Sequence, residues 1–280
     1  NSDGFSLGTD TGSDGWNEDG DAHVAWQWKA NGGTTTTNDA SSTGVGNQDS
    51  VYQANTDAGF SIVTWAGQNQ VGTMAHGLGA VPNWIIVKAR GGTEKWGVYH
   101  HKNTSAPETD QLILNATDAT ADTTTLMNDT APTSTVFTVA DSGIANEVGK
   151  TYVGYLFAEK QGYSKFGAYT GNGNQNGTFV YTGFKPAWIM IKRTDAAKNW
   201  YIADSTRSPS NITKAFLVSN SSAVEDTSGD GTDAYFDILS NGFKLRQDFS
   251  HLNADDGSHI YMAFAENPFV TSNGAANNGA

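Results

Sequence analysis

Residues 81–100 read VPNWIIVKARGGTEKWGVYH, and residues 185–204 read KPAWIMIKRTDAAKNWYIAD. The two stretches align without a gap at an offset of 104 residues, and the two tryptophans of the first align with the two tryptophans of the second. Both combine β-branched and aromatic residues with Gly, Asn and Asp, which is typical of short strands joined by turns. The sequence therefore predicts a β-structure in which one strand pattern is used at least twice.

The likeness extends to both ends of these units. Each copy is entered by a Gly-aromatic-Ser triplet, at 59–61 and at 162–164, and TYVGYLFAEK (151–160) resembles SHIYMAFAEN (258–267). A third copy of this ending, AHVAWQWKA, occupies 22–30. The first thirty residues thus look like the last part of a unit whose beginning is missing. Either the chain is a fragment of a longer polypeptide, which the sequence favours, or another subunit completes that unit.

Nearly every ordered-looking segment reads as strand, and no stretch longer than about twelve residues keeps a helical period. About seven strands per 100 residues predict an all-β fold made of tandem antiparallel β-sandwich repeats, jelly-roll-like in type. The expected organisation is the end of a preceding, incomplete repeat at 1–30, a polar linker or arm at 31–58, sandwich repeats at 59–160 and 161–269, and a flexible tail at 270–280. We expect the repeats to be joined like beads on a string.

The aromatic residues divide into two classes. Those that recur at equivalent positions are expected to fill the core of each sandwich. They are Trp84, Trp96, Trp188, Trp200, Phe157 and Phe264. Those that do not recur fall in variable, loop-like stretches and are the candidates for ligand contact at the surface. They are Trp16, Tyr52, Phe216 and Tyr235.

Composition excludes several classes of function. The formal net charge is −13, from 16 Lys and Arg against 29 Asp and Glu, so the basic stripe that nucleic acid binding requires is lacking. The same charge opposes docking on an anionic bilayer, and no apolar run approaches the roughly 18 residues of a membrane span. The chain has no cysteine, which excludes disulfides, thiolate metal sites and cysteine nucleophiles.

Two acidic segments resemble calcium-binding loops. DTGSDGWNEDGD (10–21) and DTSGDGTDAYFD (226–237) place carboxylates and a glycine at several EF-hand loop positions. The candidate ligands are Asp10, Asp14, Asp21, Asp226, Asp230 and Asp237. A true EF-hand is excluded because the flanks read as strands, and Asp-Gly turns are ordinary in an acidic β-protein. Calcium is therefore the one cofactor kept open, and none is required.

No catalytic constellation stands out. There is no Gly-x-Ser-x-Gly motif and no His-x-His or His-x-x-x-His pair, and the adjacent His100 and His101 would face opposite sides of a strand. Glu159 and Glu266 occupy equivalent positions of the repeat, which favours a structural role. Asp204 aligns with His100 of the other copy, so this carboxylate does not recur. We therefore expect a protein that is not an enzyme.

Several long motifs resemble a known family. They include AGFSIVTWAG (58–67), GYSKFGAYTGNG (162–173) and IYMAFAENPF (260–269), together with the two stretches quoted first. The chain resembles, over nearly its whole length, a repeat domain of unknown function found in tail-fibre-like and other virion structural proteins of tailed bacteriophages, notably marine ones.

The resemblance implies a virion structural protein, made in the host cytoplasm and assembled into the particle. A tail-fibre or receptor-binding segment is the leading expectation, with host-surface glycan or protein, other virion proteins and further copies of the chain as partners, most simply in a homotrimer. A capsid decoration protein and a polysaccharide depolymerase are the alternatives. The variable loops around 103–131 and 205–235 are expected to face the receptor.

Overall fold

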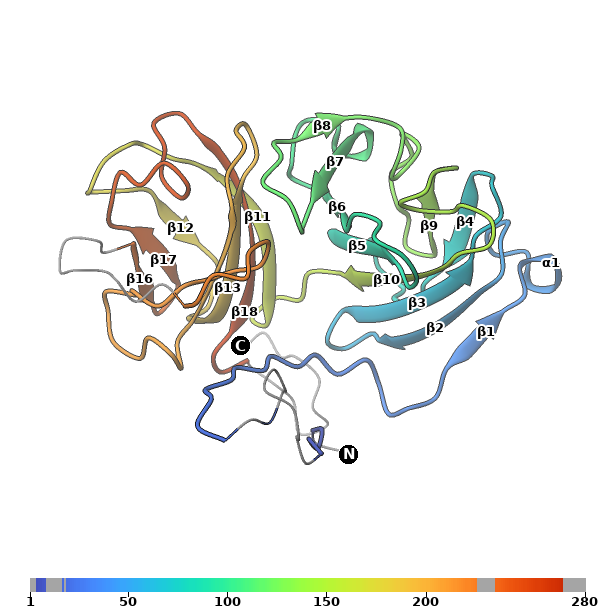
Figure 1. The fold of residues 1–280 in the computed structure, drawn as a ribbon, viewed down its shortest axis with the longest axis horizontal. Coiled ribbons are helices and arrows are strands. Elements are labelled where there is room, and N and C mark those ends of the chain that lie inside the picture. The colour runs from blue at the N-terminus through green and yellow to red at the C-terminus, as the bar shows by residue number, and fades with distance from the viewer. Residues whose placement is uncertain (1–3, 9–16, 18, 226–234, 269–280) are drawn as a thin grey trace.

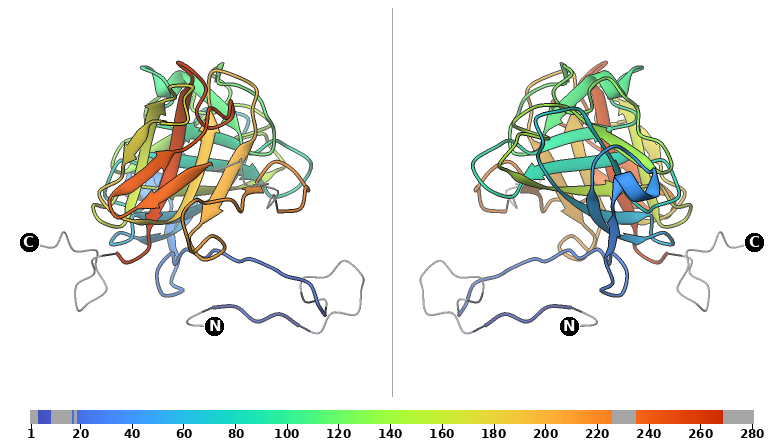
Figure 2. Two further views of the ribbon diagram at one scale, coloured as in Figure 1. Left: turned by 90° about the vertical axis from the view of Figure 1, so that its left-hand side faces the viewer. Right: turned by 90° about the vertical axis from the view of Figure 1, so that its right-hand side faces the viewer.

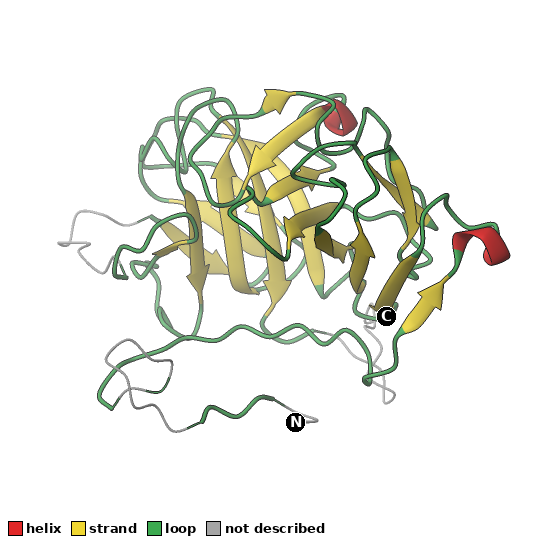
Figure 3. Cartoon of the chain, turned by 45° about the vertical axis from the view of Figure 1, so that its right-hand side comes forward, coloured by secondary structure: helices red, strands yellow, loops and turns green. Residues whose placement is uncertain are grey.

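The structure, a computed structural model, describes residues 4–8, 17, 19–225 and 235–268. The first half contains β1 (Thr36–Asn38), α1 (Ala40–Thr43), β2 (Ser50–Asn55), β3 (Phe60–Ala66), β4 (Gly72–Ala75), β5 (Trp84–Ala89), β6 (Gly97–His100), the 3-10 turn η1 (Pro107–Thr109), β7 (Asp110–Ile113), β8 (Ala121–Asp122), β9 (Val136–Val139) and β10 (Thr151–Phe157). The second half contains β11 (Ser164–Thr170), β12 (Phe179–Tyr181), β13 (Pro186–Arg193), β14 (Trp200–Asp204), β15 (Leu217–Val218), β16 (Phe236–Leu239), β17 (Gly242–Leu245) and β18 (Ser258–Ala265). The fold is nearly all β, as predicted (Figure 3).

Within the described residues, the strands form four antiparallel sheets. The large sheet of the first half has the order β1-β2-β3-β10-β5-β6-β7-β8, and that of the second half has the order β11-β18-β13-β14-β15. The two smaller sheets are β4-β9 and β12-β17-β16. In both large sheets the strand that comes last in its half lies between earlier strands: β10 pairs with β3 and β5, and β18 pairs with β11 and β13.

The central strands are apolar on both faces. In β10, Tyr152 and Leu156 point to one side of the sheet, whereas Tyr155 and Phe157 point to the other. β18 behaves alike, with Tyr261 and Met262 on opposite faces. A strand with two apolar faces is stable only where both faces are covered, so each large sheet is buried on both sides.

Three apolar clusters separate four layers of sheet. One lies between β4-β9 and the eight-stranded sheet, and a second between the five-stranded sheet and β12-β17-β16. The third fills the space between the two large sheets, which face one another in Figures 1 and 2. There Trp84 meets Trp200 with ring centroids 5.9 Å apart, and Phe166 of β11 at 6.4 Å.

This middle layer corrects two expectations. The halves are not beads on a string, because they share an aromatic layer with the edge-to-face contacts of a protein core. Of the six recurring aromatics, five lie in this shared layer rather than inside a separate core: Trp84, Phe157, Trp188, Trp200 and Phe264. Trp96 is only half-buried. Two recurring pairs, Trp84 with Trp188 and Phe157 with Phe264, place both members in the shared layer, whereas Trp200 lies there without Trp96.

Residues 31–58, expected to be a polar linker or arm, contain β1, α1 and β2 of the eight-stranded sheet. The segment folds because its polar side chains bind backbone. Asp39 caps α1 by accepting from Ser42 N, and Gly44 ends the helix in the left-handed conformation. The buried Asn38 side chain donates to Val45 O at 2.9 Å. These local bonds replace the apolar contacts that the segment lacks.

The N-terminal segment 22–30 runs as an extended chain below the two large sheets in Figure 1, and we call it the strap. Although its sequence resembles β10 and β18, it belongs to none of the four sheets. Trp26 and Trp28 turn toward the aromatic layer, and Ala30 is buried. Only one side of the strap is apolar, because Gln27 and Lys29 stand where β18 has core residues.

Candidate functional site

The four aromatic residues predicted to contact a ligand differ in their exposure to solvent. Phe216 and Tyr235 are only 2% and 7% exposed and belong to the core between the five- and three-stranded sheets. Their rings pack edge to face at 4.7 Å, so neither offers a surface for a ligand, and that expectation is wrong for both. Tyr52 is half-buried, with its ring against Gly77. Trp16 lies outside the described residues.

The predicted calcium ligands are not brought together within the described chain. Asp21 is exposed, and Asp237 of β16 forms an ion pair with Arg246 at 3.1 Å. Asp10, Asp14, Asp226 and Asp230 fall outside the described residues. Among those described, no three His, Asp or Glu side chains are grouped to hold a metal ion. The same part of the chain has no helix of the length and apolarity that a membrane span needs.

Five of the six histidines are packed into the structure. Burial lowers the pKa of His251 and of His259 to about 4, and it lowers the pKa of His100 well below its ordinary value. His76 and His101 are shifted in the same direction for the same reason. These rings are held neutral by apolar surroundings, which indicates structural positions rather than a proton-transfer site.

The buried histidines predict acid sensitivity. The unfolded chain takes up protons as the pH falls below about 6.5, whereas in the folded chain His251 and His259 do so only near pH 4 and the other buried rings below their ordinary pKa. Their contribution to stability is therefore complete above pH 6.5 and lost progressively toward pH 4. We expect the melting temperature to fall between pH 6.5 and 5, where most carboxylates stay ionised. A melting temperature that is flat over this interval, measured by circular dichroism, would contradict the assignment.

An exposed pair of aromatic rings lies on β12. Phe179 and Tyr181 are 44% and 63% exposed, while Val180 between them points into the core. The period-2 alternation of a strand places both rings on the outer face of the three-stranded sheet. Opposite them on β17 stand Lys244 and Gly242. We call Phe179 and Tyr181 the aromatic ledge.

A polar depression of about 360 Å³ adjoins the ledge. It is lined by Glu159, Gln161, Gly162, Ser164, Lys165, Tyr181, Thr182 and Gly183. Glu159 and Lys165 form an ion pair at 2.6 Å, and both side chains are partly exposed. Tyr181 belongs to the ledge and to the depression, so a flat ring borders a set of hydrogen-bonding groups.

A larger, more apolar pocket of about 680 Å³ lies between the strap and the five-stranded sheet. Trp26 and Trp188 form part of its wall, with ring centroids 6.0 Å apart. Its charges are already paired, because Arg207 donates to the carboxylates of Asp204 and Glu225. The guanidinium also lies over the Trp26 ring at 5.6 Å. The pocket is therefore built around contacts that hold the strap.

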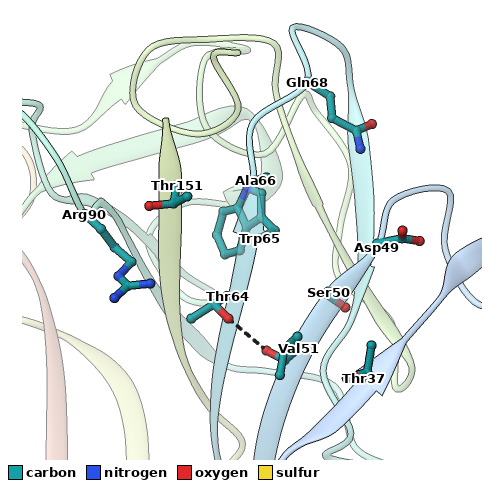
Figure 4. Close-up of a pocket in the computed structure, with 10 residues that line it drawn as sticks. All are labelled: Thr37, Asp49, Ser50, Val51, Thr64, Trp65, Ala66, Gln68, Arg90 and Thr151. Atoms are coloured by element: carbon teal, nitrogen blue, oxygen red, sulfur yellow. Dashed lines mark hydrogen bonds between the residues drawn. The ribbon is translucent and has the colours of Figure 1, made fainter. Parts of the chain in front are cut away.

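A third pocket, of about 370 Å³, opens beside β2 and β3 (Figure 4). Arg90 and Asp49 approach it from opposite sides in that view, with Trp65 between them. Two of its polar side chains already bond to the backbone: Asp49 accepts from Ala40 N at 2.9 Å, and Thr64 donates to Val51 O.

Two features of the sequence distinguish the rings of the ledge from core aromatics. At the offset of 104 residues, Phe179 and Tyr181 align with Ala75 and Gly77, so neither aromatic residue recurs in the first half. They also alternate with a valine in a short strand between turns. Together, non-recurrence and period-2 alternation separate exposed rings from core rings such as Phe216.

The comparisons with known proteins give a family and no function. No curated protein matches the chain, and no solved structure does so. A family described as a domain of unknown function (DUF7483) matches residues 1–268, a range that takes in the strap and both halves. Because this match covers nearly the whole sequence, the chain belongs to the DUF7483 family.

Proposed function

We propose that this chain is a non-enzymatic structural protein of a virion surface that binds a host-surface glycan at the aromatic ledge. The observation that carries the glycan site is the pair of exposed rings on one face of β12 beside a polar depression. The resemblance of its motifs to tail-fibre-like proteins supports the virion setting. A receptor-binding segment is favoured over a decoration protein because the ledge is an open surface with a built polar border.

The ledge has the chemistry that a sugar surface requires. Residues two apart on a strand are about 7 Å apart, so Phe179 and Tyr181 offer two ring faces to adjacent parts of one extended saccharide. Aromatic rings cover the apolar C–H face of a sugar, while carboxylate, amide and ammonium groups bond to its hydroxyls. Glu159, Gln161 and Lys165 supply those groups in the depression.

The charge of the surroundings indicates which glycans fit. The chain carries a net charge of −13, so a polyanionic saccharide would be repelled at long range. Within the depression, Glu159 and Lys165 neutralise one another. A neutral saccharide with free hydroxyls is therefore the expected ligand. Weak individual contacts become effective when several copies of the chain act together.

Tyr181→Ala is expected to weaken binding to a neutral-glycan array at least about tenfold, because a lost stacking contact contributes about 1.4 kcal/mol. Phe179→Ala should show a smaller loss, since Phe179 does not border the depression. Binding is measured on the array and by titration calorimetry with the best hit.

Phe5→Ala is the matched control, because Phe5 is a similarly exposed ring, 54% accessible, in the N-terminal segment. It should bind like the unchanged chain. Equal binding by the Tyr181→Ala variant would refute the ledge as the site. Release of reducing ends from a host polysaccharide would instead refute the non-enzymatic assignment.

We further propose that the two halves are copies of one β-sandwich module of the jelly-roll-like type. Strand order supports this, since β3-β10-β5-β6-β7 corresponds to β11-β18-β13-β14-β15. Side-chain contacts at the offset of 104 also correspond. Lys88 Nζ donates to Glu94 O at 2.8 Å, and Lys192 Nζ donates to Lys198 O at 2.8 Å.

Corresponding ring stacks support the same proposal. Trp65 stacks on Tyr152 with an interplanar angle of 12°, and its counterpart Tyr169 stacks on His259 at 4°. Trp65 and Tyr169 also donate to backbone carbonyls in corresponding loops, at 3.1 Å and 2.6 Å. Different residue types thus make one contact pattern in the two halves.

A further inference from the structure

The strap is attached to the rest of the chain by side chains far more than by backbone. Trp28 contacts Phe157, Trp188 and Phe264 with ring centroids 5.3–6.3 Å apart, and all three contacts are edge to face. In the described part of the chain, one hydrogen bond ties the strap backbone to the body: Asn55 Nδ2 donates to Lys29 O at 2.9 Å.

The three rings beneath Trp28 form an aromatic groove that depends on the strap. With the strap in place, Phe157, Trp188 and Phe264 are only 6–7% exposed. Moving the strap away would uncover a contiguous aromatic patch, which is costly in water. The groove therefore requires an occupant with the chemistry of the strap, namely two tryptophans two residues apart followed by a small residue.

The tether between the strap and the body is short and conformationally demanding. Five exposed residues, 31–35, join the buried Ala30 to β1. Within this tether Asn31 has φ of 74° and Gly33 has φ of 99°, both in the left-handed region. Left-handed geometry costs conformational energy at a non-glycine residue, although less at Asn than at most others. Short strained hinges of this kind favour exchange of a segment between copies.

Charge also favours docking of the strap on another copy. Lys29 is the only charged residue at neutral pH among residues 22–30, which contain no carboxylate, whereas the whole chain carries −13. Two bodies repel one another, but a neutral-to-basic strap is attracted to an acidic body. Arg207, whose charge is neutralised by Asp204 and Glu225, does not oppose this.

From these observations we propose that the strap of one copy docks in the aromatic groove of a second copy, so that copies of this chain are linked by strap exchange. Each exchanged strap makes the contacts that it makes within its own chain, so little is lost on exchange. The strap-lined pocket is then completed by two subunits. This proposal concerns self-association and does not depend on the glycan site.

The test places the photoreactive residue p-benzoylphenylalanine at position 28 of the full chain. Equal amounts of ¹⁵N-labelled and unlabelled copies are mixed, refolded together and irradiated, and the cross-linked peptides are analysed by mass spectrometry. Random exchange predicts that about half of the strap-to-groove cross-links join one labelled and one unlabelled peptide. Cross-links with a single label only, or an absence of cross-links to the groove, would overturn the proposal.

A second measurement uses the chain without a probe. In light scattering after size exclusion, the particle mass of the Trp26→Ala/Trp28→Ala variant is expected to be at most half that of the unchanged chain, because the strap of the variant can no longer dock. Gln27→Ala is the matched control, since Gln27 lies on the exposed side of the strap, and it should keep the mass of the unchanged chain. Equal masses for both variants would count against strap exchange.

Discussion

Trp200→Ala is expected to lower the free energy of unfolding by about 4 kcal/mol, the cost of removing a large aromatic ring from a packed interior. Trp200 is fully buried between the two large sheets and meets Trp84 at 5.9 Å. Its Nε1 donates to Ile113 O of the first half at 2.9 Å, so the substitution also leaves a buried carbonyl without its donor. Urea denaturation followed by far-ultraviolet circular dichroism measures the loss.

Trp96→Ala is the matched control for this substitution. Trp96 stands at the equivalent sequence position in the first half, yet it is only half-buried, with the Lys88 ammonium 5.9 Å from its ring. Its loss should cost about 1 kcal/mol, because less apolar surface returns to water. Equal losses for Trp96→Ala and Trp200→Ala would show that the shared aromatic layer does not stabilise the fold as described.

Lys192→Met is expected to destabilise the chain by about 3 kcal/mol, because it leaves buried carbonyls without their charged donor. Lys192 is fully buried on β13, and the three N–H groups of its ammonium are shared among four backbone oxygens, those of Arg193, Lys198, Thr117 and Ala196, which lie 2.7–3.5 Å from Nζ. Thr117 belongs to the first half, so this side chain bonds the two halves together. Burial lowers the pKa of Lys192 to about 8, and the ammonium form still predominates at neutral pH.

Lys88→Met provides the comparison, since Lys88 occupies the equivalent position and is half-buried. It donates to one carbonyl, that of Glu94. Its replacement should cost about 1 kcal/mol or less, because water can reach the freed carbonyl. Both variants are compared by denaturation at pH 7, and a Lys192→Met variant as stable as Lys88→Met would contradict the four-carbonyl role.

The sequence was sufficient to predict the all-β class because strand alternation and turn residues are local signals. The same signals fail for the segment 31–58, whose strands are stabilised by hydrogen bonds of Asn38 and Gln48 rather than by apolar alternation. A segment of Thr, Asn and Ser reads as linker until its backbone partners are known.

Recurrence also proved ambiguous. It identifies Trp84 and Trp188 as interior residues, but it does not say whether that interior lies within one half or between two. The difference is a matter of tertiary packing, which sequence spacing does not encode. For the same reason Phe216 and Tyr235 looked like surface residues, although both are core rings without counterparts in the other half.

The placement of β10 and β18 between strands that precede them in the chain has a consequence for biogenesis. On the ribosome, Ser61 emerges 95 residues before its partner Leu156, so neither large sheet can be completed until the final strand of its half has been made. Until then the flanking strands expose unpaired edges, and nascent chains are vulnerable to mutual aggregation. Pairing over such sequence separations is slow, so translation speed near residues 150 and 258 is expected to govern the yield of native protein.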